Sequence, residues 1–406
     1  MGQGYVGLPL AMAAVEAGHH VTGFEPDQER LEQLCAGTSY IEDVPGRTLS
    51  AALKSGRYRP THDDTLLTDF DIAVITVPAP LKERQPDLGA VREAAETLAR
   101  HVRKGDTVIL ESTTHPGTTR KIVLPILEAL SRLRAGTSFH LGFSPERIDP
   151  GNEQWSFANT PKIVSGLTEE CRNRVAEFYA GITQHVVLAN SLEEAELAKV
   201  FENVFRHVNV ALVNELCRVA HTLDVDVWQT LALADSRPFG FTRFSPGHGV
   251  DGHCLPVDPV FLTRHVRTQY GEPFRLVELA QDINETQPSY VVGRVQDALD
   301  TRYGKALEDA RVLALGLACK PGAADACRSP AVEVVAELRR KGAIVDALDP
   351  HVAAATQHPP QPYGTYDAVV LLTEHDEFDL AAIASEAVYV LDTRGVMPAA
   401  PHIERL

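Results

Sequence analysis

Short runs of aliphatic and β-branched residues alternate with helical patterns along most of this chain, and this alternation limits its fold more than any other feature. In the first part of the chain the strand-like runs are residues 20–24, 72–77, 107–110 and 162–165. Such alternation predicts βαβ units and a parallel sheet. We therefore expect an α/β fold that begins with an open parallel sheet covered by helices.

The middle of the chain interrupts the alternation with helices. Ser191 and Glu194 match the S-x-x-E capping box, which is typical of a helix start. The long pattern that follows places four apolar side chains on one helical stripe, namely Phe201, Phe205, Val208 and Leu212.

The alternation resumes in the last quarter of the chain. A helical pattern at 331–340 lies among strand-like runs at 312–315, 344–348, 368–372 and 388–391. This arrangement predicts a second, smaller open α/β unit. We expect three regions: a Rossmann-like domain at 1–188, a central helical region at 189–300 and a second Rossmann-like domain at 301–406.

Charge and cysteine usage narrow the possible partners. The 55 acidic side chains outnumber the 38 basic ones, so no basic field is available for a nucleic acid. No apolar run of about 18 residues exists, and the first residues lack a cationic or apolar leader. We expect a cytoplasmic protein with neither nucleic acid nor membrane as partner. The six cysteines lack paired C-x-x-C spacing, which argues against a disulfide framework and against a metal site.

A G-x-G-x-x-G pattern at the start of the chain suits a dinucleotide. It opens a helical pattern at 8–17, and Glu25 closes the next strand-like run. The glycines allow a tight turn, the helix N-terminus faces the pyrophosphate, and the Glu25 carboxylate accepts ribose hydroxyls, which favours NAD over NADP. The alternative is a plain glycine-rich turn. The expected cofactor-binding residues of this turn are Gly2, Gly4, Tyr5, Val6 and Gly7.

The strand that normally leads into such a turn is absent, because only Met1 precedes Gly2. Either the start of the protein lies upstream of Met1, or the sheet lacks its central strand. The second case would remove ladder hydrogen bonds and buried apolar area.

A glycine-rich loop at 245–258 presents the thiol of Cys254, with the carboxylate of Asp258 four residues later. A thiol in such a loop can attack an aldehyde, and hydride loss from the resulting hemithioacetal gives a thioester. Four of the other five cysteines are expected to be small buried apolar groups, and these are Cys35, Cys171, Cys217 and Cys319.

Further polar residues stand where a ligand is expected. Lys199 and Asn203 are four apart on the long helix and so share a face, where an ammonium and an amide can stabilise an oxyanion; a solvated lysine is the alternative. The polar stretches 111–114 and 144–147 each follow a strand-like run, at the edge where α/β sheets bind ligands. For each stretch the alternative is a turn or a cap.

Taken together, these stretches resemble the UDP-glucose/GDP-mannose dehydrogenase family, whose members use NAD to oxidise the C6 alcohol of a nucleotide sugar to a carboxylate. The resemblance covers almost the whole chain. It rests on GYVGLPLA at 4–11, EST at 111–113, FSPER at 143–147, ELAKVFEN at 196–203, NE at 214–215, GHCLPVDP at 252–259, GLACKP at 316–321 and DTR at 392–394.

Within the family, two stretches resemble the branch that includes UDP-N-acetylglucosamine and UDP-N-acetylmannosamine 6-dehydrogenases. These are FSPERIDPGN at 143–152 and PFGF at 238–241. The branch leaves the sugar open. The resemblance also implies the architecture: an N-terminal NAD domain, a central helix used for dimerisation and a C-terminal domain that holds the nucleotide of the sugar. The expected partners are therefore a nucleotide sugar and at least one further copy of the chain.

The resemblance implies roles for individual residues. Cys254 is the nucleophile, Lys199 and Asn203 stabilise the oxyanion, and Asp258 orients water or the thiol. Near the water and the cofactor it places Glu146 with Thr113 or Thr114, and it adds Pro78 to the cofactor contacts. The substrate contacts that it implies are Arg147, Gly252, His253, Lys320 and Arg328.

The implied reaction consumes two NAD in sequence. The first oxidation makes an aldehyde, the second oxidises the aldehyde adduct of Cys254, and water then cleaves the thioester. A thiolate needs a nearby cation or donor to lower its pKa, and the oxyanion needs donors such as Lys199 and Asn203.

Two departures from the family pattern bear on activity. Asp251 stands where the family has a glycine, and a carboxylate close to Cys254 would raise the pKa of its thiol. Cys327 occupies the position of the family's arginine, and Arg328 is displaced by one residue. An alternative is therefore a homologue that binds nucleotide sugars with impaired or no turnover. A 3-hydroxyacid type of dehydrogenase would leave Cys254 and the second α/β unit without a role.

Overall fold

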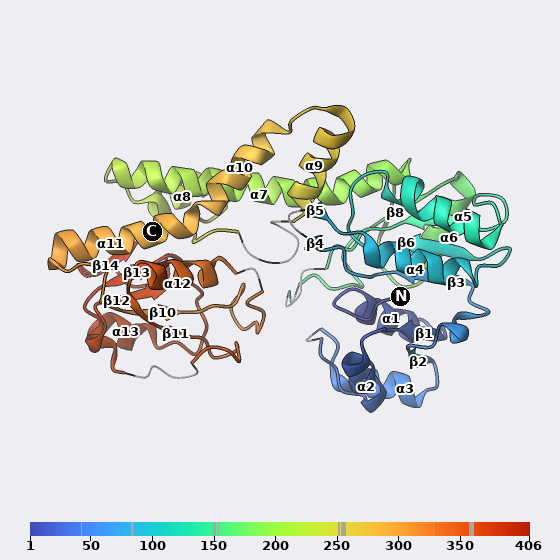
Figure 1. Cartoon of the computed structure of the whole chain (residues 1–406), viewed down its shortest axis with the longest axis horizontal. Coiled ribbons are helices and arrows are strands. Elements are labelled where there is room, and N and C mark those ends of the chain that lie inside the picture. The colour runs from blue at the N-terminus through green and yellow to red at the C-terminus, as the bar shows by residue number, and fades with distance from the viewer. Residues whose placement is uncertain are drawn as a thin grey trace. The chain divides into compact units, whose positions relative to one another are not determined.

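The computed structural model describes residues 1–41, 43–82, 85–148, 152, 154–250, 252, 257–327, 329–356 and 361–406, and it divides the chain into two compact units (Figure 1). The first unit comprises Met1–Glu202 and Val260–His265, and the second comprises Asn203–Pro259 and Val266–Leu406. None of the helices among the described residues has the length and apolar character needed to span a bilayer.

The first unit is built on a five-stranded sheet with the order β3-β6-β7-β8-β9 and a separate pair, β1-β2. Its strands are β1 (Val21–Phe24), β2 (Tyr58–Thr61), β3 (Ile72–Ile75), β6 (Thr107–Leu110), β7 (His140–Phe143), β8 (Lys162–Gly166), β9 (Val186–Leu188) and the short hairpin β4 (Leu81–Lys82) and β5 (Gln85–Pro86). Its helices are α1 (Gly7–Glu16), α2 (Gln28–Ala36), α3 (Gly46–Lys54), α4 (Gly89–Ala99), α5 (Leu124–Ser131), α6 (Glu169–Ala180) and the first part of α7 (Leu192–Thr222); the short helical segments are η1 (Asp64–Leu67) and η2 (Thr119–Val123).

Alternate residues of the interior strand β6 face the two sides of this sheet. Val108 and Leu110 pack with residues of α4 and α5, whereas Ile109 packs with Leu10 of α1 and Val175 of α6. Helices on both faces bury every residue of β6 and β7, which explains why the strand-like run at 107–110 is almost continuously apolar.

Met1 and Gly2 join the two sheets of the first unit. The Met1 ammonium group donates to Val74 O at 2.9 Å, Thr76 N donates to Met1 O at 2.9 Å, and Gly2 N donates to Phe24 O at 2.8 Å. These residues thus lie between β3 and β1, and among the described residues no strand precedes α1.

The second unit is built on a five-stranded, wholly parallel sheet with the order β11-β10-β12-β13-β14. Its strands are β10 (Arg311–Leu315), β11 (Ile344–Leu348), β12 (Ala368–Leu371), β13 (Val390–Asp392) and β14 (Ile403–Arg405). Its helices are the rest of α7, α8 (Val227–Asp235), α9 (Asp258–Tyr270, of which Val260–His265 belong to the first unit), α10 (Arg275–Glu285), α11 (Gln287–Tyr303), α12 (Pro330–Arg340), α13 (Leu380–Glu386) and the short η3 (Tyr363–Thr365). Val312 and Ala314 pack toward α11 and α12, and Leu313 and Leu315 pack toward α13.

The α/β architecture with parallel-sheet units and a long central helix is as predicted. One strand pair differs, because β8 runs antiparallel to β7. The capping box is present in part: Ser191 Oγ accepts from Glu194 N at 3.1 Å, while the Glu194 carboxylate accepts from Asn190 N at 3.0 Å. Among the cysteines, Cys171 and Cys217 are buried as predicted, whereas Cys35 is exposed and Cys319 is partly exposed.

Candidate active site

The glycine-rich turn before α1 leaves room for a ligand at one position. Gly2 has φ +86°, and a Cβ there would lie 3.1 Å from Thr76 O. A Cβ at Gly7 would lie 1.9 Å from Gly2 O, so neither residue can carry a side chain. A Cβ at Gly4, in contrast, would meet no atom within 4 Å. The turn is therefore closed on its inner side and open at Gly4, next to the N-terminus of α1.

Glu25 lies directly after β1, and its carboxylate is bound to this turn. Its Oε2 accepts from Gln3 N at 2.8 Å, and its Oε1 accepts from Asp27 N at 3.2 Å. The residue is 4% exposed. Of the other turn residues, Val6 precedes the first turn of α1 and Tyr5 is exposed.

The loops that follow β3 and β6 lie side by side at the carboxyl edge of the sheet. Ser112 Oγ donates to Val77 O at 2.6 Å and so links them. Pro78 is exposed and Thr113 is half-buried. Thr114 is 1% exposed, and its Oγ1 has no hydrogen-bond partner among the described residues.

These features fit a dinucleotide. The open backbone at Gly4 and the N-terminus of the ten-residue helix α1 suit a pyrophosphate, and the Glu25 carboxylate suits ribose hydroxyls. The unpartnered hydroxyl of Thr114 is a polar group that a bound ligand can satisfy.

Glu196, near the start of α7, anchors the loop after β6. Its Oε1 accepts from Thr119 N at 2.8 Å and from Thr119 Oγ1 at 2.6 Å, and its Oε2 accepts from Gly117 N at 2.5 Å. Burial raises the pKa of Glu196 to about 7. The carboxylate thus holds the segment that carries Thr113 and Thr114.

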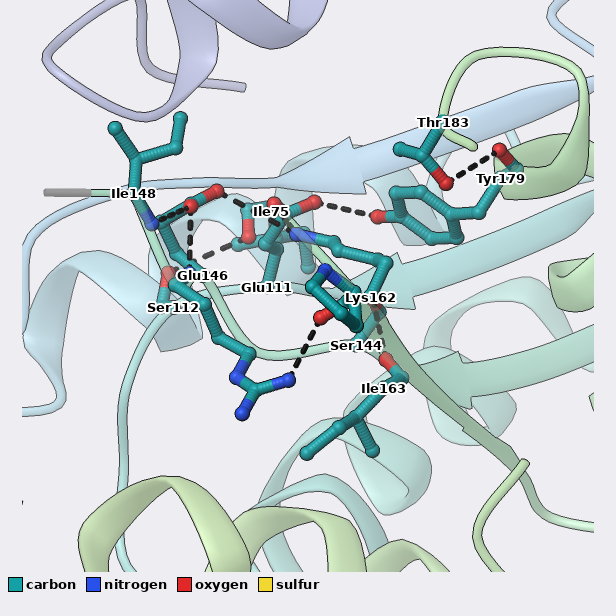
Figure 2. A network of polar contacts seen from close by, with 12 residues as sticks. Ile75, Glu111, Ser112, Ser144, Glu146, Ile148, Lys162, Ile163, Tyr179 and Thr183 are labelled. Carbon is teal, nitrogen blue, oxygen red and sulfur yellow. Dashed lines mark hydrogen bonds and ion pairs between the residues drawn. The ribbon is translucent and has the colours of Figure 1, made fainter. Parts of the chain in front are cut away.

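Glu146 belongs to a buried network at the same edge of the sheet (Figure 2). Its Oε1 accepts from Arg147 N at 2.6 Å and from Ile148 N at 2.5 Å. Its Oε2 lies 3.4 Å from Lys162 Nζ, which also donates a hydrogen bond to Glu111 Oε1. Tyr179 Oη donates to the other oxygen of Glu111. Lys162 reaches this edge because β8 is antiparallel to β7, so that its first residue lies beside the end of β7.

The environment shifts the pKa values of the two carboxyl groups of this network in opposite directions. Burial raises the pKa of Glu111 to about 8. Burial also acts to raise the pKa of Glu146, but the Lys162 ammonium and the hydrogen bonds from Glu111 and from two backbone N–H groups hold it below its usual value. At neutral pH Glu146 is therefore the ionised carboxylate, and Glu111 carries a proton.

Arg147, the next residue, is engaged within the first unit. Its Nη2 donates to Glu202 Oε1 at 2.6 Å and its Nη1 donates to Pro161 O at 2.7 Å. Nε reaches the other Glu202 oxygen at 3.3 Å, so the ion pair is bidentate.

Two of the predicted residues of α7 fall in different units. Lys199 is half-buried, in the first unit, and forms no ion pair with a described residue. Asn203 is fully buried in the second unit, where its Nδ2 donates to the Asp258 carboxylate and its Oδ1 accepts from Arg206 Nη2 at 2.6 Å. Asp258 is 2% exposed, at the first position of α9.

The loop that leads toward Cys254 is anchored within the second unit. Gly247 N donates to Asn214 Oδ1 at 2.9 Å, and a Cβ at Gly249 would lie 2.9 Å from the Pro330 side chain. His248 is buried with Nδ1 3.4 Å from Thr393 Oγ1. Gly252 has φ +88°. The predicted residues Asp251, His253 and Cys254 lie outside the described residues.

The loop after β10, which carries Lys320, is held by Asp349. Asp349 Oδ2 accepts from Leu317 N at 2.7 Å and Ala318 N at 2.9 Å and lies 3.1 Å from His375 Nε2. Burial opposes ionisation, but these donors hold the pKa of Asp349 far below its usual value. Lys320 itself is exposed, and Arg328 lies outside the described residues.

Matches to known protein families cover each part of this arrangement. Residues 1–183 match the NAD binding domain of the UDP-glucose/GDP-mannose dehydrogenase family, residues 193–286 its central domain and residues 313–399 its UDP binding domain. The chain belongs to this family. The predicted family resemblance is confirmed, and so is NAD as the cofactor.

Relatives of known activity cover most of the chain. It is 33% identical over 379 residues to the UDP-N-acetyl-D-mannosamine dehydrogenase of Pyrococcus horikoshii. The aligned residues cover 93% of this chain and 89% of that protein. It is 35% identical over 390 residues to the UDP-N-acetyl-D-glucosamine 6-dehydrogenase of Pseudomonas aeruginosa, with 93% of this chain and 90% of that protein covered. The solved structure of the Pyrococcus horikoshii UDP-D-ManNAc dehydrogenase has a TM-score of 0.92 at 31% identity and covers 100% of this chain and 97% of its own.

Sequence reasoning missed three anchoring groups, namely Lys162, Glu196 and Asp349. A lysine at the start of an otherwise apolar strand-like run was the available signal for Lys162. For Asp349 the signal was an acidic residue directly after a strand-like run, the position that also singled out Glu25.

Proposed function

We propose that this NAD-dependent nucleotide-sugar 6-dehydrogenase oxidises a UDP-linked N-acetylhexosamine to the corresponding uronic acid through a thioester on Cys254. Membership of the family supports the oxidation of a nucleotide sugar at C6, since an NAD binding domain and a UDP binding domain occur in one chain. The choice of an N-acetylhexosamine is supported by the two relatives, which are named for UDP-N-acetyl-D-mannosamine and UDP-N-acetyl-D-glucosamine.

The first unit binds the cofactor in this proposal. The backbone at Gly4 and the N-terminus of α1 bind the pyrophosphate, Glu25 accepts the ribose hydroxyls, and Thr114 donates its free hydroxyl. When bound, NAD accepts the two electrons and the proton that each oxidation removes from C6. Loss of the first hydride from C6, together with release of the hydroxyl proton to water, converts the alcohol to an aldehyde.

Residues of the second unit and of α7 carry out the covalent step. The Cys254 thiolate attacks the aldehyde carbon, and the oxyanion formed there accepts hydrogen bonds from Lys199 and Asn203. An amide has two N–H donors, so Asn203 can donate one to Asp258 and the other to the oxyanion. The second oxidation then leaves an acyl group on the sulfur.

Hydrolysis completes the reaction. Glu146 accepts a proton from water while the water oxygen bonds to the acyl carbon, and the C–S electron pair leaves with the Cys254 sulfur. The low pKa of Glu146 relative to Glu111 supports this assignment, because a base must be ionised to act.

Apolar side chains on α7 support a homodimer as a further part of the proposal. Leu212 and Val219 are seven residues apart on one face of the helix and are 60% and 49% exposed. Leu276 and Leu279 of α10 are exposed as well. Exposed apolar side chains grouped on a helix mark an interaction surface, and a second copy of the chain is the proposed partner. We propose the cytoplasm as the location.

Turnover with defined sugars tests the proposal. Purified protein with excess NAD and either UDP-N-acetylmannosamine or UDP-N-acetylglucosamine should form two NADH per sugar with one of them. Cys254→Ala should leave at most one NADH per sugar, while Cys35→Ala, which removes an exposed thiol, should keep two. Two NADH per sugar with UDP-glucose alone would contradict the choice of sugar, and two NADH with Cys254→Ala would contradict the thioester.

A further inference from the structure

Three side chains next to Glu146 are buried although they carry polar or charged groups, namely Glu111, Lys162 and Tyr179. Glu111 is 0%, Lys162 4% and Glu146 8% exposed, and the phenol of Tyr179 is completely buried. An ammonium and two carboxyl groups in a protein interior are unfavourable unless each is paired, and apolar side chains of similar volume usually stabilise a core as well or better. This cluster therefore suggests a role beyond packing.

The polar contacts form a chain that leads from the interior to the edge of the sheet. Tyr179 Oη donates to one oxygen of Glu111, the other oxygen of Glu111 pairs with Lys162 Nζ, and the same Nζ faces Glu146 Oε2 at 3.4 Å (Figure 2). The ammonium is enclosed further by the Tyr179 ring, whose centre lies 5.1 Å from Nζ. Lys162 thus has a fixed position, set from behind by Glu111 and Tyr179.

Glu146 is held at both oxygens by this arrangement. Two backbone N–H groups bind Oε1, and Lys162 faces Oε2. With one cation and two carboxyl groups, only one carboxyl group is fully compensated when ionised, and Glu146 has the larger number of donors. The pKa of Glu111, raised to about 8 by burial, agrees with this division.

We propose that Lys162 is a positioning residue for Glu146: its ammonium, clamped by Glu111 and Tyr179, keeps the Glu146 carboxylate ionised and aimed at the hydrolytic water. The inference rests on the proposed role of Glu146 in thioester hydrolysis and adds the group that tunes it. Lys162 itself exchanges no proton in the step.

Two substitutions should affect the acidic limb of the pH profile differently. Lys162→Met removes the cation and should move the acidic midpoint of kcat upward by one pH unit or more. Glu111→Gln replaces a carboxyl group that is protonated in this pH range by a neutral amide, so it leaves the charges beside Glu146 unchanged and should keep the midpoint near that of the wild type. A cluster that only supports packing would give no upward shift with Lys162→Met.

Substitution of Lys162 should slow thioester hydrolysis without slowing the earlier steps of the reaction. For Lys162→Met we expect thioester hydrolysis to slow by about ten- to hundredfold at neutral pH, with an acyl-enzyme visible by intact-protein mass spectrometry and an unchanged kcat/KM for the UDP-sugar. Lys162→Arg, which restores a cation, should recover part of the rate. Val164→Ala, in the buried part of the same strand, is the control for loss of packing and should lower Tm without moving the midpoint.

A titration without turnover separates this inference from the proposed function. The carboxyl ¹³C signal of Glu146, assigned by its loss in Glu146→Gln, should titrate at higher pH in Lys162→Met and near its wild-type pH in Glu111→Gln. An unchanged titration in Lys162→Met, or the same shift in both variants, would overturn the inference, and if Lys162→Met fails to fold, Lys162→Gln takes its place. If the signal shifts as expected but Glu146→Gln hydrolyses the thioester at the normal rate, the assigned role of Glu146 is wrong, and the positioning of its carboxylate stands.

Discussion

Asn203 and Asp258 are joined directly in the interior of the second unit: the amide nitrogen donates to the carboxylate, although the two residues are 55 positions apart. The contact fixes the orientation of the amide, because Oδ1 is bound by Arg206 at 2.6 Å and one N–H is left without a partner among the described residues. It also links α7 to the first turn of α9, which begins directly after the segment that contains Cys254.

The free N–H of Asn203 leads to the first prediction. Asn203→Ala should lower kcat by about a hundredfold or more, because one donor to the oxyanion is lost, and should leave the KM for NAD unchanged. Steady-state kinetics measure both constants. Asn209→Ala removes an exposed amide from the same helix and is the matched control. Equal kcat values for the two variants would exclude Asn203 from oxyanion stabilisation.

Glu196 makes the stability of the first unit depend on pH. Its pKa is raised from 4.5 to about 7 in the folded chain, so folding favours the protonated form. Its contribution is therefore fully present below pH 4.5 and is lost as the pH rises through about 7. The free energy of unfolding of the wild type, measured against that of Glu196→Gln by urea titration, should fall by about 3 kcal/mol from pH 4.5 to 8. A pH-independent difference between the two proteins would contradict the prediction.

The sequence predicted strands well where their residues are aliphatic. The run 107–110 coincides with β6, whose four residues are all buried, and the runs 312–315 and 344–348 agree with β10 and β11 to within one residue, although β11 is only partly buried. β14 (Ile403–Arg405) escaped prediction because its three half-buried residues include two charges. The antiparallel pairing of β8 with β7 was also not predictable, since a local pattern does not encode the direction of a neighbouring strand.

The candidate site was predictable only in part for a similar reason. Glu111 and Glu146 follow strand-like runs and lie in stretches that carry the family resemblance, and these two signals marked them. Lys162 is 51 residues from Glu111 and is the first residue of a strand, so no local spacing connects the two. Glu196 and Thr119 are likewise 77 residues apart. Contacts of this kind depend on which strands and helices become neighbours in space.

Asp349 should control the conformation of the loop after β10, which carries the expected substrate contact Lys320. It accepts from four backbone N–H groups, and Asp349→Ala would leave these donors buried without an acceptor, which should destabilise the unit by about 3 kcal/mol or more. The loop of Lys320 should loosen, so that calorimetry measures weaker UDP binding. Asp376→Asn, which neutralises an exposed carboxylate nearby in sequence, should change neither quantity.

Asp349 should also make the stability of the second unit sensitive to acid. The pKa of Asp349 is depressed in the folded chain, so its stabilising contribution is present above the ordinary pKa of an aspartate and is lost as the pH falls through the depressed value. Asp349→Asn should therefore be less stable than the wild type at pH 7, and this gap should narrow toward pH 3. Thermal unfolding at both pH values measures it, and a constant gap would show that Asp349 is not the titrating group.

The apolar face of α7 gives the last prediction, which concerns the proposed homodimer. Leu212→Asp places a charge at a position that is 60% exposed in the single chain, so folding of the monomer should be little affected. If the face is buried between two copies, the charge must lose its water on association, and the dimer should dissociate at micromolar concentration. Light scattering coupled to size-exclusion chromatography measures the mass. Leu130→Asp makes the same change at a 53% exposed leucine of α5 and should leave the dimer intact. An unchanged dimer with Leu212→Asp, or dissociation with both variants, would mean that α7 is not the specific interface.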